Sequence, residues 1–305
     1  MPESPVAPSP LIFDRRLIRA RRRRAASMGA ATFLLDRAAA DLADRLAAVL
    51  RRFELALDLG TLGEAVRAAL ARLGSVGTIV AAGAAPPNGD AFAPAFVVAD
   101  EEALPFRDAA FDLVVSALAL QFVNDLPGVL VQIRRALKPD GLFLAALLGG
   151  ETLTELRQSF AAAESDIEGG ASPRVAPFAD LRDLGALLQR AGFALPVADA
   201  DRITVRYDSA FALMHDLRRM GATNAIIDRR RTPLKRATLM RAAEIYAQRF
   251  SDDDRRVRAT FEVLWLSGWA PHPSQQQPLK PGTANARLAD ALGTREISTG
   301  EKAPR

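Results

Sequence analysis

The chain has 305 residues, of which 49% are hydrophobic and 25% are charged, so it contains enough apolar side chains to build a large core. It has no cysteine, which excludes disulfides, thiolate metal sites and cysteine nucleophiles. Its two histidines, His215 and His272, exclude a three-histidine metal centre, and we expect them on a helix surface and in a loop. The 40 basic residues are offset by 36 acidic ones, and the net charge of +4 indicates no nucleic-acid partner.

The first part of the chain is predicted to be a tail followed by helices. Residues 1–12 are rich in proline and form the expected disordered tail. Residues 13–54 are predicted as an N-terminal helical segment, because apolar side chains from Phe33 to Leu50 recur with helical spacing. No apolar run is long enough to cross a membrane, and residues 1–10 have no secretion-signal pattern, so we expect neither feature.

Short apolar runs in the middle of the chain predict five buried strands. The runs are residues 55–60, 78–82, 96–100, 111–116 and 142–147. Residues 64–73 and 126–137 have helical spacing, and the second of these helices ends at a turn over residues 138–141, where Gly141 accepts a positive φ. Strands that alternate with helices in this way are typical of a parallel sheet covered on both faces.

Beyond the fifth strand, the spacing predicts a helix at residues 181–190 and a strand at residues 202–207. The predicted division of the chain is a core at residues 55–207, a helical insertion or lid at 208–258, a final strand at 259–270 and a loose tail at 271–305. The arginine run at residues 229–231 is either a solvated face or a docking surface for a protein partner. Trp265 and Trp269 share one strand face, which favours core packing.

Ligands of parallel sheets bind beyond the carboxyl ends of the strands, which places the candidate site in the loops that follow them. The candidate ligand-binding residues are Asp58, Gly60, Thr61, Gly63, Asp100, Glu101, Ser116, Leu118 and Gln121. Two alternatives remain open: Asp58 can cap the following helix, and residues 100–102 can form a solvated acidic turn. Phe122 either lines the cleft or packs in the core, and residues 124–125 are expected to cap a helix. The sequence assigns no catalytic residue and no metal ligand.

Several segments, taken together, resemble the class I S-adenosylmethionine-dependent methyltransferases. These segments are residues 13–15, 55–60, 100–106, 111–116, 123–127 and 137–141. Residues 149–153, 168–173 and 190–193 further resemble one branch, the methyltransferase-like assembly factors of respiratory complex I, which are protein-arginine hydroxylases in mitochondria and have bacterial relatives. The resemblance implies a Rossmann-like sheet that is mostly parallel with an antiparallel last strand, N-terminal helices, and a helical insertion before that strand.

The same resemblance implies S-adenosylmethionine as the cofactor. Asp58 and Gly60 match the motif at which the loop backbone approaches the methionine end of the cofactor. Asp100 matches the acid that accepts a hydrogen bond from the adenine amino group, a role that suits an acceptor-only carboxylate. Residues 116–122 are implied to face the cofactor and the substrate.

The sequence departs from the family's first-loop motif. Leu62 stands where the family has bare backbone, Glu64 replaces the last glycine, and one glycine is displaced to Gly63. Residues 81–84 offer no acid for the ribose hydroxyls, and a breaker cluster at residues 86–89 replaces the next helix. Two of the three expected cofactor contacts, the glycines of the first loop and the acid for the ribose, are therefore altered or absent. If the Leu62 side chain filled the space for the cofactor beside Gly60 and Asp100, the chain would keep the fold without binding the cofactor.

These features lead to three hypotheses about function. The first is an enzyme that hydroxylates or methylates an arginine of a protein substrate, a quinone-oxidoreductase subunit of complex I, during assembly. The alternative is a non-catalytic assembly factor that has lost cofactor binding, and a weaker one is a methyltransferase of quinones or acyl groups. The expected location is the bacterial cytoplasm, with peripheral association at the inner membrane as an option, or the mitochondrial matrix in a eukaryote.

Overall fold

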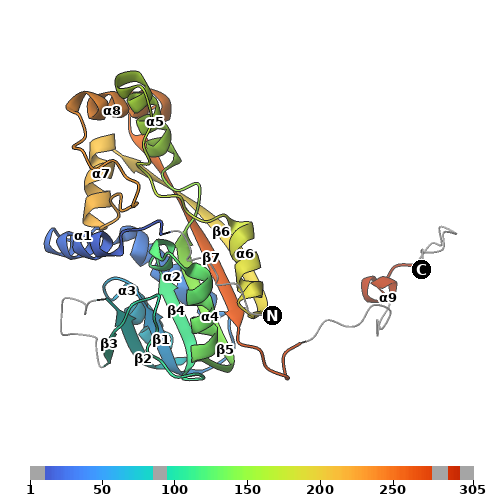
Figure 1. Cartoon of the computed structure of the whole chain (residues 1–305). Helices are drawn as coiled ribbons and strands as arrows, with labels where there is room; N and C mark the ends of the chain where they lie inside the picture. The colour runs from blue at the N-terminus through green and yellow to red at the C-terminus, as the bar shows by residue number, and fades with distance from the viewer. Residues whose placement is uncertain (1–10, 85–94, 277–287, 296–305) are drawn as a thin grey trace, which may run out of the picture. The chain divides into compact units, whose positions relative to one another are not determined.

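Residues 11–84, 95–276 and 288–295 are described in this computed structural model. Their strands form a seven-stranded sheet in the order β3-β2-β1-β4-β5-β7-β6 (Figure 1). The strands are β1 (Phe53–Leu59), β2 (Val76–Gly83), β3 (Phe96–Val98), β4 (Phe111–Ala117), β5 (Leu137–Leu148), β6 (Ala194–Tyr207) and β7 (Val257–Trp269). β1 to β5 are parallel, and β7 is antiparallel to both β5 and β6. The predicted fold class is confirmed.

The helices are α1 (Arg15–Ser27), α2 (Phe33–Ala47), α3 (Ala65–Arg72), the 3-10 turn η1 (Leu120–Phe122), α4 (Leu126–Ala136), α5 (Thr154–Glu168), α6 (Leu181–Arg190), α7 (Ala210–Arg219), α8 (Arg236–Phe250) and α9 (Leu288–Leu292). Four of these helices, α1, α4, α6 and α7, begin at a polar side chain that caps the first turn. Asp14 accepts a hydrogen bond from the Leu17 amide at the start of α1. Asp125 likewise accepts one from the Gly128 amide at the start of α4, which confirms its predicted capping role.

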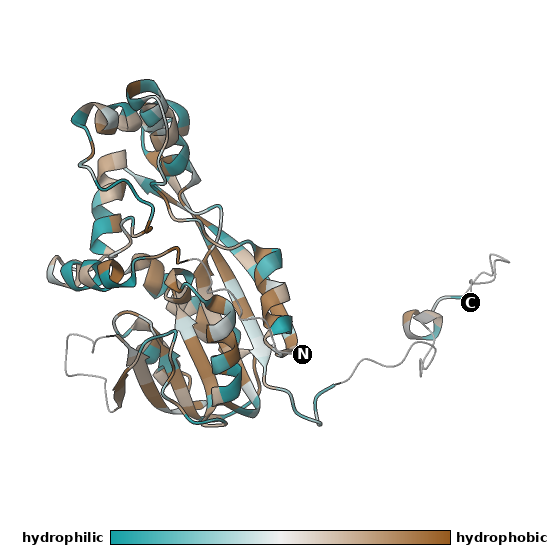
Figure 2. Cartoon of the chain, viewed as in Figure 1, coloured by the Kyte–Doolittle hydropathy of each residue, from teal (hydrophilic) through white to brown (hydrophobic). Residues whose placement is uncertain are grey.

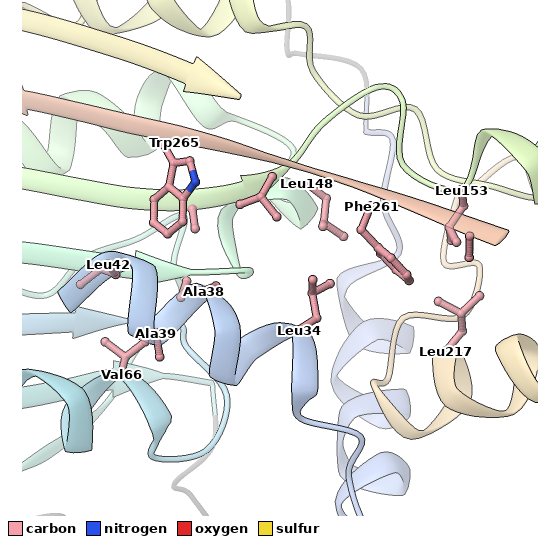
Figure 3. Packing of buried hydrophobic residues seen from close by; sticks show 14 of the residues in the cluster. Leu34, Ala38, Ala39, Leu42, Val66, Leu148, Leu153, Leu217, Phe261 and Trp265 are labelled. Atoms are coloured by element: carbon pink, nitrogen blue, oxygen red, sulfur yellow. The ribbon is translucent and has the colours of Figure 1, made fainter. Parts of the chain in front are cut away.

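The central strands alternate residue by residue between two apolar cores, as the period of two in a strand requires. In β4, Leu113 and Val115 belong to the core under α2 and α3, whereas Val114 belongs to the core under α4 and α6. Figure 3 shows Leu34 and Leu42 of α2 in the first core, together with Trp265 of β7. The predicted core packing of Trp265 is confirmed, and Figure 2 shows the middle strands in brown.

Strands β6 and β7 continue past the end of β5 as a two-stranded ribbon. β5 pairs with β7 as far as Leu148, opposite Val263, whereas β6 and β7 stay paired as far as Tyr207 and Val257. Helices α5, α7 and α8 pack around this ribbon (Figure 1). The insertion is therefore not one helix, because an irregular segment at residues 220–235 separates α7 from α8.

Two local predictions were wrong. Residues 138–141 lie inside β5 as a bulge, since the β4–β5 register jumps between Phe111 and Leu113. The positive φ falls on Asp140 (+64°) and not on Gly141, whose lack of a side chain instead allows close approach to the Lys138 carbonyl. Helix α5 was not predicted.

Several predictions concern residues outside the described part of the chain. The tails at residues 1–12 and 271–305 lie mostly outside it, and the breaker cluster at residues 86–89 lies wholly outside it. The domain boundaries stay a prediction. No helix among the described residues is long and apolar enough to cross a membrane.

Candidate functional site

The loop after β1 contains two glycines in the left-handed backbone conformation, Gly60 (φ +72°) and Gly63 (φ +66°). A Cβ atom on Gly60 would lie 3.0 Å from the Cγ and Oε1 atoms of Glu101, whereas a Cβ on Gly63 would meet open space. Leu62, between them, is 40% exposed, so its side chain does not fill a buried hollow. The bare backbone at Gly60 is therefore retained, but the Glu101 side chain lies against it.

Asp58, at the end of β1, lies below this loop and is buried with Arg67 of α3. The Arg67 Nη1 atom donates to Asp58 Oδ2 at 2.8 Å, and Nη2 donates to the Gly63 carbonyl at 2.6 Å. Burial raises the pKa of Asp58 to about 6, against the opposing effects of the Thr61 hydroxyl and the Arg67 guanidinium. Asp58 does not cap α3, whose N-cap is Glu64. The carboxylate thus fixes the loop from inside.

The acidic run at residues 100–102 is bound by arginines of α1 and is not a solvated turn. Arg15 donates to Asp100 at 2.7 Å and also hydrogen-bonds to Glu101, and Arg19 donates to Asp100 at 2.5 Å. Arg15 also lies 3.1 Å from the Glu102 carboxylate. The acceptor that the resemblance assigns to adenine is therefore paired with two guanidinium groups of the same chain.

The electrostatics of Asp100 follow from this pairing. Partial burial alone would raise the pKa of Asp100, but the Glu102 amide and the guanidinium groups of Arg15 and Arg19 together lower it. Asp100 therefore stays ionised at neutral pH, where its carboxylate only accepts hydrogen bonds. The arginines were not singled out by the sequence, although Arg15 and Arg19 stand four residues apart on one helix face.

Ser116 and Thr61 join the ends of β1 and β4. Ser116 is fully buried and its hydroxyl donates to the Leu59 carbonyl at 2.7 Å. The Thr61 hydroxyl oxygen accepts from the Ala117 amide at 3.0 Å. Both side chains hold together the loops that follow β1 and β4.

Leu118 and Gln121 lie in the turn after β4. Leu118 has a φ of +51°, an unfavourable conformation for a branched residue, and its amide donates to the Ala146 carbonyl. Gln121 Nε2 donates to the Leu118 carbonyl at 2.9 Å, while its Oε1 atom is buried without a hydrogen-bond partner among the described residues. This turn is thus a strained segment that carries one unused acceptor.

A cavity of about 10 Å³ lies where α1 meets these loops, a volume close to that of a single water site. Its lining residues are Arg15, Ile18, Arg19, Arg22, Ala84, Glu101, Ala119 and Phe122. Half of the lining residues belong to α1. The α1 side chains, and not Leu62, therefore close the hollow.

Phe122 lines this small cavity and packs against other rings, and its predicted role in a substrate cleft stays a prediction. Its ring meets Phe13 and Phe178 edge-on, at centroid distances of 5.7 and 6.3 Å. The Arg22 Cζ atom lies 5.6 Å from the ring centroid, and Arg22 Nη1 lies 3.8 Å from Glu101 Oε1. Arg22 thus has an aromatic neighbour and a long ion pair.

S-adenosylmethionine does not fit this arrangement of side chains. Cavities for ligands of that size are on the order of 300 Å³ or more, against the cavity of about 10 Å³ found here. Arg15 and Arg19 form ion pairs with the Asp100 carboxylate, which is then not free to accept from adenine. The end of β2 has no acid that could bind the ribose hydroxyls. The cofactor can enter only where these arginines move away.

The remaining candidates lie elsewhere. His215 and His272 are exposed, on α7 and in a loop, as predicted. Arg229 pairs with Asp14 at 3.4 Å and Arg230 pairs with Glu168, so part of this run joins the insertion to its neighbours. The docking role of the run stays a prediction. Within the described ranges, no group of three acidic or histidine side chains is placed to hold a metal ion.

Comparison with known proteins gives matches at several levels. A family model described as "Methyltransferase domain" matches residues 57–145. "Arginine-hydroxylase NDUFAF5, mitochondrial" of Homo sapiens is 40% identical over 287 residues, which cover 92% of this chain and 83% of the human protein. "Malonyl-[acyl-carrier protein] O-methyltransferase" of Laribacter hongkongensis is 41% identical, but over only 62% of this chain and 61% of that protein.

Solved structures agree on the fold. The structure of "a putative methyltransferase" from Bacillus halodurans superposes with a TM-score of 0.52 at 19% identity, covering 77% of this chain and 99% of that one. At this identity the likeness shows the fold alone.

Proposed function

This chain belongs to the family of the NDUFAF5 arginine-hydroxylases, and we propose that it modifies an arginine side chain of a protein partner during the assembly of respiratory complex I or a bacterial quinone oxidoreductase. The observation that supports this most is the extent of the likeness. The match covers 92% of the chain, so it includes most of the helical insertion as well as the methyltransferase domain at residues 57–145.

The chemistry of the site suits a guanidinium group. Three successive carboxylates, at residues 100–102, already gather arginine side chains at the carboxyl ends of the strands. Carboxylates bind guanidinium through charge-assisted hydrogen bonds that also fix its orientation. Neither histidine lines the hollow, so we propose that the site contributes mainly by aligning the arginine.

S-adenosylmethionine is the cofactor that we propose, on condition that Arg15 and Arg19 release Asp100. A ligand that binds only the folded chain raises its melting temperature. We therefore expect S-adenosylhomocysteine at millimolar concentration to stabilise the protein in a thermal-shift assay.

Intact-mass analysis of the substrate tests the reaction itself. A quinone-oxidoreductase subunit incubated with the protein, S-adenosylmethionine, dioxygen and a two-electron donor is expected to gain the mass of one oxygen if it is hydroxylated, with the second oxygen atom leaving as water. It is expected to gain the mass of one methylene if it is methylated, with S-adenosylmethionine as the methyl donor. An unchanged mass in the presence of demonstrated cofactor binding would contradict the proposed activity.

A non-catalytic assembly factor is the second candidate, and the closed hollow favours it. In that case the chain would bind the subunit without binding S-adenosylhomocysteine, a combination that co-purification and calorimetry would reveal. An acyl methyltransferase is a weaker candidate, which the Laribacter likeness favours over part of the chain. It predicts methylation of a malonyl-acyl carrier protein and no change in the subunit.

A further inference from the structure

Helix α1 is fixed at both ends to other parts of the chain. At its start, the Ile12 and Phe13 amides donate to Asn124 Oδ1 at 2.8 and 2.7 Å. At its end, the Arg219 guanidinium donates to the Gly29 carbonyl at 2.7 Å. The backbone of α1 is therefore held in place at both ends. A ligand can enter the hollow if the α1 side chains move while this backbone stays fixed.

The three arginines on the inner face of α1 are held to different degrees. Arg15 and Arg19 make direct hydrogen bonds to Asp100, at 2.7 and 2.5 Å. Arg22 has only the 3.8 Å approach to Glu101 and the Phe122 ring as partners among the described residues. Burial lowers the pKa of Arg22, against the opposing effect of Glu101. Arg22 is thus the least firmly bound of the three.

The surroundings of Arg22 match what an arginine side chain requires. Glu101 supplies a carboxylate that is 96% buried, and Phe122 supplies an aromatic face within the range of a cation–π contact. A planar guanidinium can stack on the ring while its edge faces the acid, which a compact ammonium cannot do as well. The pair therefore favours arginine over lysine.

The network around this pair is incompletely satisfied. Arg19 Nε is buried without a hydrogen-bond partner among the described residues, Arg15 Nη1 has only the Glu102 carboxylate at 3.1 Å, and both residues line the small cavity. Because a guanidinium has donors and no acceptor, an arginine that enters this hollow competes with the α1 arginines for the neighbouring carboxylates.

We propose that the space between Glu101 and the Phe122 ring is the subsite for the guanidinium group of the substrate arginine, and that Arg22 occupies it as an internal competitor. This inference rests on the proposed function, because it assigns the substrate's position in that site. The substrate arginine displaces the Arg22 side chain, which moves outward along its partly exposed edge.

Calorimetric titration of the full chain with Nα-acetyl-arginine N-methylamide tests the subsite. Arg22→Ala removes the competitor and is expected to bind this probe at least tenfold more tightly than the wild type. Arg23→Ala is the matched control, because Arg23 is the neighbouring arginine on the exposed side of α1, and it should bind like the wild type. Arg22→Gln, which is shorter than arginine but still polar, should give a smaller gain, and serves if Arg22→Ala does not fold.

Three outcomes would overturn the inference. The first is equal affinity of Arg22→Ala and Arg23→Ala for the arginine probe. The second is that Arg22→Ala gains as much affinity for the matching lysine probe as for the arginine probe. The third is that Arg22→Ala gains affinity for S-adenosylhomocysteine but not for the arginine probe. The last would assign the space between Glu101 and the Phe122 ring to the cofactor and leave the proposed function intact. Conversely, a tenfold gain for the arginine probe without S-adenosylhomocysteine binding would uphold the subsite and count against the proposed enzyme.

Discussion

Two arginine–carboxylate clusters flank the loop after β1, and they differ in burial. Asp58 and Arg67 lie below the loop, with side chains 1% and 5% exposed. The cluster of α1 arginines with residues 100–102 lies above it, and its outer pair, Arg19 and Asp100, is 39% and 36% exposed. The same kind of ion pair therefore fixes a loop where it is buried. Where it is exposed to water, an arginine can leave its carboxylate at little cost.

The largest expected effect comes from breaking the sealed pair. At about pH 8, where Asp58 is ionised in the wild type, Arg67→Met leaves its carboxylate buried without its cation, which should lower the free energy of unfolding by about 3–5 kcal/mol. Urea denaturation measures this loss. Arg72→Met, at an exposed arginine of the same helix, is the control and should change stability by less than about 0.5 kcal/mol. Equal stability of the two variants would show that Asp58 does not need Arg67.

The two clusters are also expected to respond to pH with opposite signs. Burial raises the pKa of Asp58 from 3.8 to about 6, so the folded chain holds this proton more tightly than the unfolded chain. Its contribution to stability is full below about pH 4 and falls by about 1.4 kcal/mol per pH unit as the pH rises to about 6. Asp100 has a lowered pKa, so its contribution is present above its ordinary pKa and is lost as the pH falls.

Urea denaturation between pH 4 and 7 separates these contributions. Asp58→Asn should remove the fall between pH 4 and 6, whereas Asp100→Asn should leave that fall in place. Parallel stability profiles of Asp58→Asn and the wild type would contradict the assignment.

Two glycine substitutions compare the covered and the open side of the loop. Gly60→Ala and Gly63→Ala each place a side chain at positive φ, which costs about 1–2 kcal/mol. Gly60→Ala also brings a Cβ within 3.0 Å of Glu101, so it should destabilise the chain by about 1 kcal/mol more than Gly63→Ala. Thermal denaturation of both variants gives the difference, and a larger loss for Gly63→Ala would place Glu101 away from the loop.

The smallest effect is expected where the outer cluster meets water. Arg19→Ala should lower the free energy of unfolding by less than about 1 kcal/mol, because exposed ion pairs contribute little. The pKa of Asp100 should rise, since Arg19 helps to hold it low. A carboxyl titration followed by NMR measures that shift, with Arg16→Ala as the control from the exposed face of α1. An unchanged pKa of Asp100 would separate Arg19 from the cluster.

The sequence predicted the sheet well because its strands are short apolar runs whose period is local. It missed α5 because that helix buries Glu155, Ser159 and Glu164, which obscure the apolar spacing. It placed the positive φ on Gly141 because glycine prefers it, but the bulge in β5 puts it on Asp140. Local propensity does not determine the register of a sheet.

The sequence predicted where the candidate residues lie in the fold but not which side chains they contact, and their role as a binding site stays a prediction. The loops that contain Asp58, Gly60 and Asp100 lie at the strand ends as expected. The partners of the two acids, Arg67 and Arg15, could not be identified, because an arginine on a helix usually faces solvent. Arg15 is 85 residues from Asp100 in the chain, so only the folded arrangement brings them together.

Calorimetric titration with S-adenosylhomocysteine tests most directly whether the hollow at the strand ends is a cofactor site that α1 arginines hold closed. The wild type should bind measurably, and Arg19→Ala should bind several-fold more tightly because it frees part of the Asp100 carboxylate. No heat and no thermal shift at millimolar ligand, in both proteins, would contradict a cofactor site and leave the non-catalytic assembly factor.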